Sequence, residues 1–246
     1  MSDVQVSIIS SEEDLLTAAD IPLRCFGHQI ADQIYRAFNP GWDTPEGTKA
    51  HHARLAQRWR SVTRDRNNDL NTIFLQATLP PSHPGGARVI AGLAIWVQLS
   101  TVPGHGDPPA TDLRAAVDLN ALYPGDEAAQ EYLVQLDRGL HGRRKQVVQE
   151  KATADPPAVF VLDLCTVSPD FQRRGIAQAL VQWGLDEAKR RGGLEALTEA
   201  SVMGRGAYAK LGFKQEGEEI DYGVDEEFRA RATLPSNVFM RTGELK

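Results

Sequence analysis

The segment Gln172-Arg-Arg-Gly-Ile-Ala177 combines residue types that favour the binding of a phosphate group. Gly175 allows a ligand to approach the main chain closely, and Ala177 keeps the following turn thin. If a helix starts here, its first amides are unpaired and carry about +0.5 of an elementary charge, which attracts anions. Arg173 and Arg174 add charge-assisted donors. These residues alone indicate either an anion site or an ordinary helix N-terminus with two solvated arginines.

The flanking residues predict a strand, a tight loop and a helix, in that order. Val159–Val167 is an apolar, β-branched run, typical of a strand covered on both faces. Ser168-Pro-Asp170 ends this strand because proline cannot donate to a ladder. From Ile176 onward, small and apolar residues recur at helical spacing up to the double glycine Gly192-Gly193. The candidate anion site therefore lies at a strand–loop–helix corner.

Two motifs in this part of the chain resemble those of one enzyme superfamily. Gln172, Gly175 and Ala177 meet the signature Gln/Arg-x-x-Gly-x-Gly/Ala, and Tyr208-Ala-Lys-Leu-Gly-Phe213 follows at a fitting distance. Together they resemble the GCN5-related N-acetyltransferase (GNAT) superfamily, most strongly over residues 159–213. The resemblance implies one α/β (α+β) acetyltransferase-like domain over residues 1–246, with a mixed, mainly antiparallel central sheet flanked by helices.

The preceding residues predict the remaining strands of such a sheet. Val4–Ile9 alternates as a first strand, and Thr72–Thr78 and Arg88–Leu99 predict an antiparallel pair. Within the last of these, Gly92-Leu-Ala-Ile-Trp96 resembles the third strand of fungal-type members. Helical segments are expected after Ser11, over Gly27–Phe38 and over Lys49–Thr63.

Residues 102–157 are expected to form a helical insertion between the third and fourth core strands, where family members often have a short connection. A long helix is expected from Asp126 to Glu150, with an apolar face that includes Leu140. The basic run Gly142-Arg-Arg-Lys-Gln146 is interpreted as a helix face or end. Two roles stay open for the insertion: a packing element, or a cap over the acceptor pocket.

The resemblance implies transfer of an acetyl group from acetyl-CoA to an amine of a small-molecule acceptor by direct attack, with no metal. Backbone groups of the strand end would pair with the pantetheine arm as a neighbouring strand does, and an amide there would polarise the thioester carbonyl. A β-bulge is expected to splay the strands at this point. The implied cofactor-binding residues are Cys165, Thr166, Val167, Gln172, Arg173, Arg174, Gly175, Ile176, Ala177 and Gln178.

Three side chains are candidates for proton transfer. Tyr208 matches the tyrosine that commonly protonates the departing thiolate, and an unperturbed pKa of about 10 keeps a tyrosine protonated at neutral pH. Asp163 is a candidate base, because strand alternation places it on the face of Cys165 and Val167. Glu199 is the second carboxylate considered, and a base reached through water is the further alternative.

The composition limits the classes of partner and compartment. A net charge of −6 and a pI of about 5.6 argue against a nucleic-acid partner. Two cysteines favour a reducing compartment. Neither a leader peptide nor an apolar run near the ~18 residues of a membrane span is evident, so we expect a cytoplasmic protein without a membrane partner. A monomer or a homodimer is expected.

Two other functions stay open from the sequence. The first is a non-catalytic acyl-CoA-binding or regulatory module that uses the insertion as a partner surface. The second is a protein or peptide N-acetyltransferase. The presence of Gln172, Gly175, Ala177 and Tyr208 favours an enzyme over the non-catalytic module. A small-molecule acceptor is expected over a protein because no reader or targeting domain is evident beside the core and the net charge is only modestly acidic.

Overall fold

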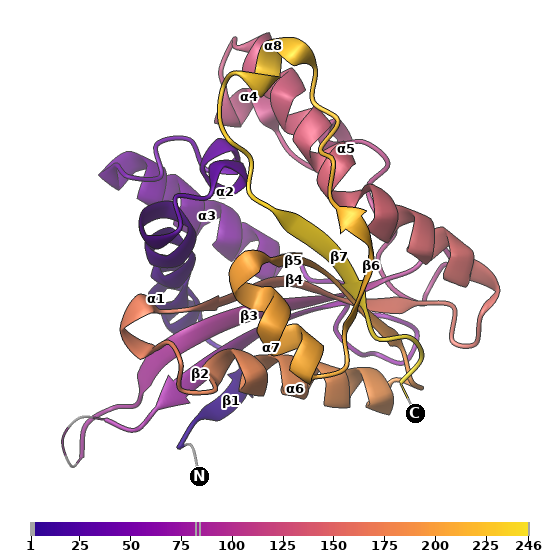
Figure 1. Cartoon of the computed structure of the whole chain (residues 1–246). Coiled ribbons are helices and arrows are strands. Elements are labelled where there is room, and N and C mark those ends of the chain that lie inside the picture. The colour runs from indigo at the N-terminus through magenta and orange to yellow at the C-terminus, as the bar shows by residue number, and fades with distance from the viewer. Residues whose placement is uncertain (1–2, 82, 84, 246) are drawn as a thin grey trace.

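A central sheet organises the protein (Figure 1). The computed structural model describes residues 3–81, 83 and 85–245. Within them, seven strands follow the order β1-β2-β3-β4-β5-β7-β6, and only β4 and β5 run parallel. This confirms the predicted mixed, mainly antiparallel sheet. The strands are β1 (Gln5–Ile8), β2 (Thr72–Leu79), β3 (Val89–Leu99), β4 (Val159–Val167), β5 (Glu195–Ser201), β6 (Lys214–Glu219) and β7 (Asn237–Arg241).

Helices cover both faces of this sheet. One apolar cluster joins one face to α6, and a second joins the opposite face to α1, α3 and α5. The α-helices are α1 (Glu12–Pro22), α2 (Gln33–Phe38), α3 (Pro45–Arg60), α4 (Leu119–Leu122), α5 (Glu127–Glu150), α6 (Ile176–Arg190), α7 (Val202–Lys210) and α8 (Glu226–Arg229). The 3-10 helices are η2 (Leu113–Ala115), η3 (Lys151–Thr153) and η4 (Pro169–Phe171), and η1 (Leu23–Gln29) is a π-helix.

The core beneath α6 is built around Trp96. Its ring stacks on Phe160 with 5.1 Å between centroids. Gly184 of α6 packs directly on the indole, where an added Cβ would overlap the ring. This glycine therefore sets how closely α6 approaches the sheet, and with it the position of the loop before α6.

The N-terminal helical region differs from its prediction. Gly27–Phe38 was expected to be one helix, but the structure breaks it between η1 and α2. Ala31 adopts a left-handed conformation with φ of 57°, and Asp32 caps α2 by accepting from the amide of Tyr35 at 2.9 Å. The break turns η1 toward the loop that follows β4, as its contact with η4 shows.

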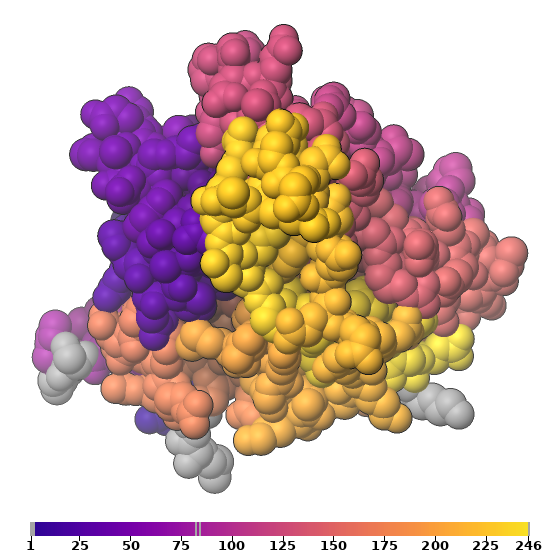
Figure 2. Space-filling model, turned by 45° about the horizontal axis from the view of Figure 1, so that its top comes forward, coloured from indigo at the N-terminus to yellow at the C-terminus, as the bar shows by residue number. Residues whose placement is uncertain are grey.

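The insertion packs against two distant parts of the chain. Leu133 and Val134 of α5 join a cluster with α2, and Gly139 lies directly against the main chain of Tyr222 between β6 and β7. Figure 2 shows that C-terminal segment (yellow) seated between the N-terminal helices (indigo) and the insertion (pink). The three segments thus form one continuous layer above the sheet.

Candidate active site

A fork between β4 and β5 forms the basis of the site. The two strands pair only over Val159–Val161 and Glu195–Leu197, and then separate. In the β3–β4 ladder Trp96 faces Leu162 while the adjacent Ile95 faces Leu164, so Asp163 is an extra residue in β4. This confirms the predicted β-bulge, a feature that bends a strand and increases its twist.

The bulge overturns the predicted orientation of Asp163. Its carboxylate meets Arg58 of α3 and Arg144 of α5, whereas Cys165 packs into the cluster on the α6 face. The two side chains therefore lie on opposite faces of the sheet, not on one. The physical reason is that one extra residue shifts the alternation of a strand by one step.

A cavity of about 490 Å³ opens between the ends of the two strands. It contains most of the predicted site residues, but not Asp163, Thr166 or Arg174. A second hollow, between α1 and α3, contains none of the predicted site residues. The lining of the fork cavity is Cys25, Phe26, Ile30, Cys165, Val167, Gln172, Arg173, Gly175, Ile176, Ala177, Gln178, Ser201, Met203, Gly204, Gly206, Ala207, Tyr208 and Lys210.

The loop before α6 has the main-chain conformation of an anion site. Arg173 and Gly175 both adopt left-handed conformations, with φ of 64° and 80°. Such turns produce concavities lined by successive amides. The first bond across the start of α6 runs from the Ala179 amide to the Gly175 carbonyl, at 3.0 Å, and helix geometry leaves the preceding amides free for a ligand.

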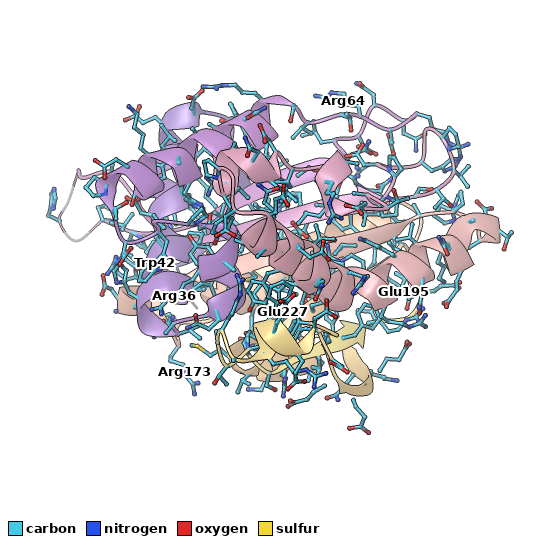
Figure 3. The ribbon with its side chains drawn as sticks, turned by 90° about the horizontal axis from the view of Figure 1, so that it is seen from above. Arg36, Trp42, Arg64, Arg173, Glu195 and Glu227 are labelled. Atoms are coloured by element: carbon cyan, nitrogen blue, oxygen red, sulfur yellow. The ribbon has the colours of Figure 1, made fainter. Side chains whose placement is uncertain are left out.

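The two arginines of the loop lie at its rim. Arg173 projects from the edge of the molecule (Figure 3). The Arg174 guanidinium lies over the ring of Phe171, 5.6 Å from its centroid, and not in the cavity. Because both side chains are exposed, the amides of the loop are the better-ordered donors.

The main chain of β4 presents alternate residues to the cavity. The Ser168 amide donates to Ala91 of β3 at 2.9 Å, so antiparallel alternation directs the Thr166 amide to β3 as well. Cys165 and Val167 consequently turn their amides away from β3, into the fork. Thr166 also uses its hydroxyl to bond Leu93 of β3, at 3.4 Å. Cys165 and Val167, and not Thr166, are therefore placed to pair with a ligand.

Tyr208 lies at the inner end of this cavity. Its hydroxyl and the Cys165 thiol are hydrogen-bonded to each other, and Gly204, one turn earlier on α7, leaves room for its ring. Burial raises the pKa of Tyr208 well above 10. Burial also raises the pKa of the Cys165 thiol to about 12. At neutral pH the tyrosine is therefore a proton donor and the cysteine is not a thiolate.

The two candidate carboxylates are both bound to Arg144. This guanidinium donates to Asp163 at 2.7 Å and to both oxygens of Glu199, from Nε at 3.1 Å and from Nη2. Arg58 donates to the second oxygen of Asp163 at 2.8 Å. Burial alone would raise the pKa of Asp163, but Arg58 and Arg144 together hold this pKa well below its ordinary value. Asp163 is therefore a weak proton acceptor.

Arg144 was not predicted as a site residue from the sequence. Its side chain is only 9% exposed, although it belongs to the basic run 142–146, which was interpreted as a helix face or end. The available signal was its position four residues after Leu140, which places it on the apolar side of α5.

The contribution of η1 was also missed. Cys25, Phe26 and Ile30 close one side of the cavity, and the Val167 amide faces the Cys25 sulfur, a contact that a ligand paired with this amide would replace. Gln29 exchanges two amide hydrogen bonds with Gln172, at 2.8 and 3.0 Å. No local sequence pattern predicts these contacts, because they join residues more than a hundred positions apart.

Comparisons with known proteins bear on the family and the fold. Residues 151–222 match the family model described as an acetyltransferase (GNAT) domain. The match makes residues 151–222 similar to a GNAT acetyltransferase domain and supports an acyltransferase, and the whole chain shares its fold with GNAT structures. No curated protein matches the chain. The resemblance to fungal-type members stays a prediction.

Solved structures show the same fold at low sequence identity. Arylalkylamine N-acetyltransferase 2 from Aedes aegypti is 18% identical, with a TM-score of 0.59 over 97% of this chain and 98% of its own. A mosquito arylalkylamine N-acetyltransferase-like 5b is 14% identical, with a TM-score of 0.54 over 97% and 98%. A protein from Corynebacterium glutamicum described as histone acetyltransferase HPA2 and related acetyltransferase is 15% identical, with a TM-score of 0.53 over 100% and 98%.

Within residues 3–81, 83 and 85–245, each helix is too short or too polar to cross a bilayer.

Proposed function

We propose that this protein transfers the acetyl group of acetyl-CoA to an amine of a small-molecule acceptor by direct attack. One observation carries the proposal: a protonated tyrosine, the free amides before α6 and the outward-facing amides of β4 share one cavity. These are the groups that an acyl-CoA donor needs at its two ends. Bound acetyl-CoA supplies the activated acetyl thioester.

The residues of the chain then have distinct tasks. The amides of the loop at Gly175 and the start of α6 hold the pyrophosphate, with Gln172 and the arginines at the rim. The main chain of Cys165 and Val167 holds the pantetheine arm as an added strand, and one of these amides polarises the thioester carbonyl. The Tyr208 hydroxyl exchanges its bond with Cys165 for one with the departing sulfur and donates its proton there.

Direct attack is favoured over an acetylated cysteine. Only the thiolate form of a cysteine is a good nucleophile, and burial raises the pKa of Cys165 to about 12 and that of Cys25 to about 11. Both thiols in the cavity therefore stay protonated at neutral pH.

The acceptor is proposed by analogy with the similar structures. Two of them are named arylalkylamine N-acetyltransferases, so this fold accommodates small amines in those proteins. The amine must lose a proton. Asp163 and Glu199 are bound to guanidinium groups, so we propose that water, and not either carboxylate, carries this proton away. The predicted role of Asp163 as a base is not retained in this proposal.

Calorimetric titration with acetyl-CoA tests the binding step. The wild type should bind with a Kd on the order of micromolar. Gly175→Glu should weaken binding at least about thirtyfold, because a side chain and a negative charge then enter the anion site. Gly125→Glu is the matched control: this glycine of the insertion also has a positive φ, 71°, and open space around it. Its binding should equal that of the wild type.

An amine-library screen follows for the protein that binds. Acetylation of small amines supports the proposal. Acetylation of peptides alone would favour a peptide N-acetyltransferase, and binding without turnover of any amine would favour a non-catalytic module. A well-folded wild type that does not bind acetyl-CoA contradicts the proposal. Sedimentation analysis of the same sample distinguishes the monomer and homodimer expected from the sequence.

A further inference from the structure

Arg144 bridges the two strands of the fork at matching positions. The last main-chain pair is Val161 with Leu197. Asp163 and Glu199 each lie two residues beyond that pair, and Arg144 is bonded to both. Two residues further along, Cys165 of β4 and Ser201 of β5 line the cavity. The guanidinium is thus located between the point where the strands part and the point where the cavity opens.

The other edges of the two strands are already fixed. The β3 ladder continues along β4 to Val167, and the β7 ladder continues along β5 to Ser201. Between the strands themselves, Thr198 donates to the Leu162 carbonyl at 3.0 Å, just past the last pair. Among the described residues, the next polar connection between β4 and β5 runs through Arg144. The width of the fork beyond that point depends on this side chain.

The geometry of the bridge is rigid. The side chains of Arg144 and Glu199 are only 9% and 5% exposed, and a planar guanidinium fixes both the distance and the orientation of the carboxylates that it binds. Its helix is fixed as well, because Gly139 packs against the main chain of Tyr222 and Val147 and Val148 are buried in the core. Figure 3 shows α5 lying across the sheet. The insertion therefore places the Arg144 guanidinium at the fork in a fixed position.

We propose that Arg144 is a positioning residue that holds β4 and β5 apart at the width required by the pantetheine arm, which gives the insertion a function in cofactor binding. This proposal rests on the proposed acetyl-CoA site. Arg144 touches neither the cofactor nor the acceptor, and it acts through Asp163 and Glu199. Displacement of the β4 amides by about 1 Å is enough to reduce a rate about a hundredfold in a positioned reaction.

Substitution of Arg144 tests the bridge. Arg144→Met should weaken acetyl-CoA binding about tenfold and reduce kcat at least tenfold. Arg144→Lys should fall between this variant and the wild type, because one ammonium does not reproduce the planar fork. Arg143→Met is the matched control, since its more exposed guanidinium pairs with Glu150 and Glu216 outside the fork. Its Kd and kcat should stay within twofold of the wild type.

A second variant separates positioning from stability. Arg144→Met leaves two buried carboxylates without their partner, which can prevent folding. The triple variant Arg144→Met, Asp163→Asn, Glu199→Gln removes both charges and should fold. Its acetyl-CoA binding should remain weaker than that of the wild type, as in Arg144→Met. Amide hydrogen exchange over residues 162–167 should be faster than in the wild type.

The possible failures are distinguishable. A wild type that does not bind acetyl-CoA overturns the proposed function and, with it, the bridge. A wild type that binds, together with a folded triple variant of unchanged Kd, kcat and hydrogen exchange, overturns the positioning role of Arg144 alone.

Discussion

Replacement of Tyr208 by phenylalanine isolates the proposed acid. The change deletes one hydroxyl, whose partner in the structure is the Cys165 thiol, while the ring keeps its place against Gly204 and Phe213. Loss of one hydrogen bond typically lowers the free energy of unfolding by about 1 kcal/mol. The variant should therefore remain folded and bind acetyl-CoA with a Kd within about threefold of the wild type.

The effect on turnover should be much larger. A positioned general acid contributes about 10²- to 10⁴-fold, so we expect kcat to fall by at least a factor of about 100, which is about 2.7 kcal/mol of activation free energy. Burial raises the pKa of Tyr208 well above 10, so the hydroxyl of the wild type stays protonated from pH 6 to 9. The ratio of wild-type to variant kcat should therefore be constant over this range.

Steady-state release of the CoA thiol, measured with an amine identified in the screen, provides the assay. Tyr123→Phe is the matched control, because it deletes a hydroxyl that donates to the Ala37 carbonyl at 2.8 Å, away from the cavity. Tyr208→Phe with unchanged Kd and with kcat within threefold of the wild type would refute the assignment of the acid.

Three further results are expected. Mixing the enzyme with acetyl-CoA alone should leave the intact protein mass unchanged, because burial raises the pKa of Cys165 to about 12, and an acetyl adduct would contradict direct attack. Gly184→Ala should lower the free energy of unfolding by about 1–3 kcal/mol in urea titrations, because its Cβ overlaps Trp96; an unchanged midpoint would show that α6 can move. Burial lowers the pKa of His51 to about 4, so the unfolded chain takes up this proton first as the pH falls. The contribution of neutral His51 to the free energy of unfolding, about 3 kcal/mol, is therefore complete above pH 6.5 and lost toward pH 4. His51→Gln should lose less stability than the wild type between these two pH values. Urea titrations at both pH values measure this difference.

The sequence by itself determined the elements whose signals are local. The change from strand to helical periodicity located β4, the loop and α6, because side-chain spacing depends only on neighbouring residues. Ser11 was identified as a helix cap, and it accepts from the Asp14 amide at 3.1 Å. The motif from Gln172 to Ala177 likewise contains its own turn and helix start, so the local structure of the candidate anion site was predicted from the sequence.

Only the tertiary structure decided the environment of the charged groups. Asp163 was placed on the wrong face because the bulge depends on pairing with β3, which is distant in sequence. Arg144 was assigned to a basic run, yet it is buried between Asp163 and Glu199, which follow it by 19 and 55 positions. The pKa of a carboxylate depends on neighbours in space. The sequence therefore predicted the turn and helix start of the loop before α6, whereas packing of the insertion on the sheet determined the charged partners of the two candidate carboxylates.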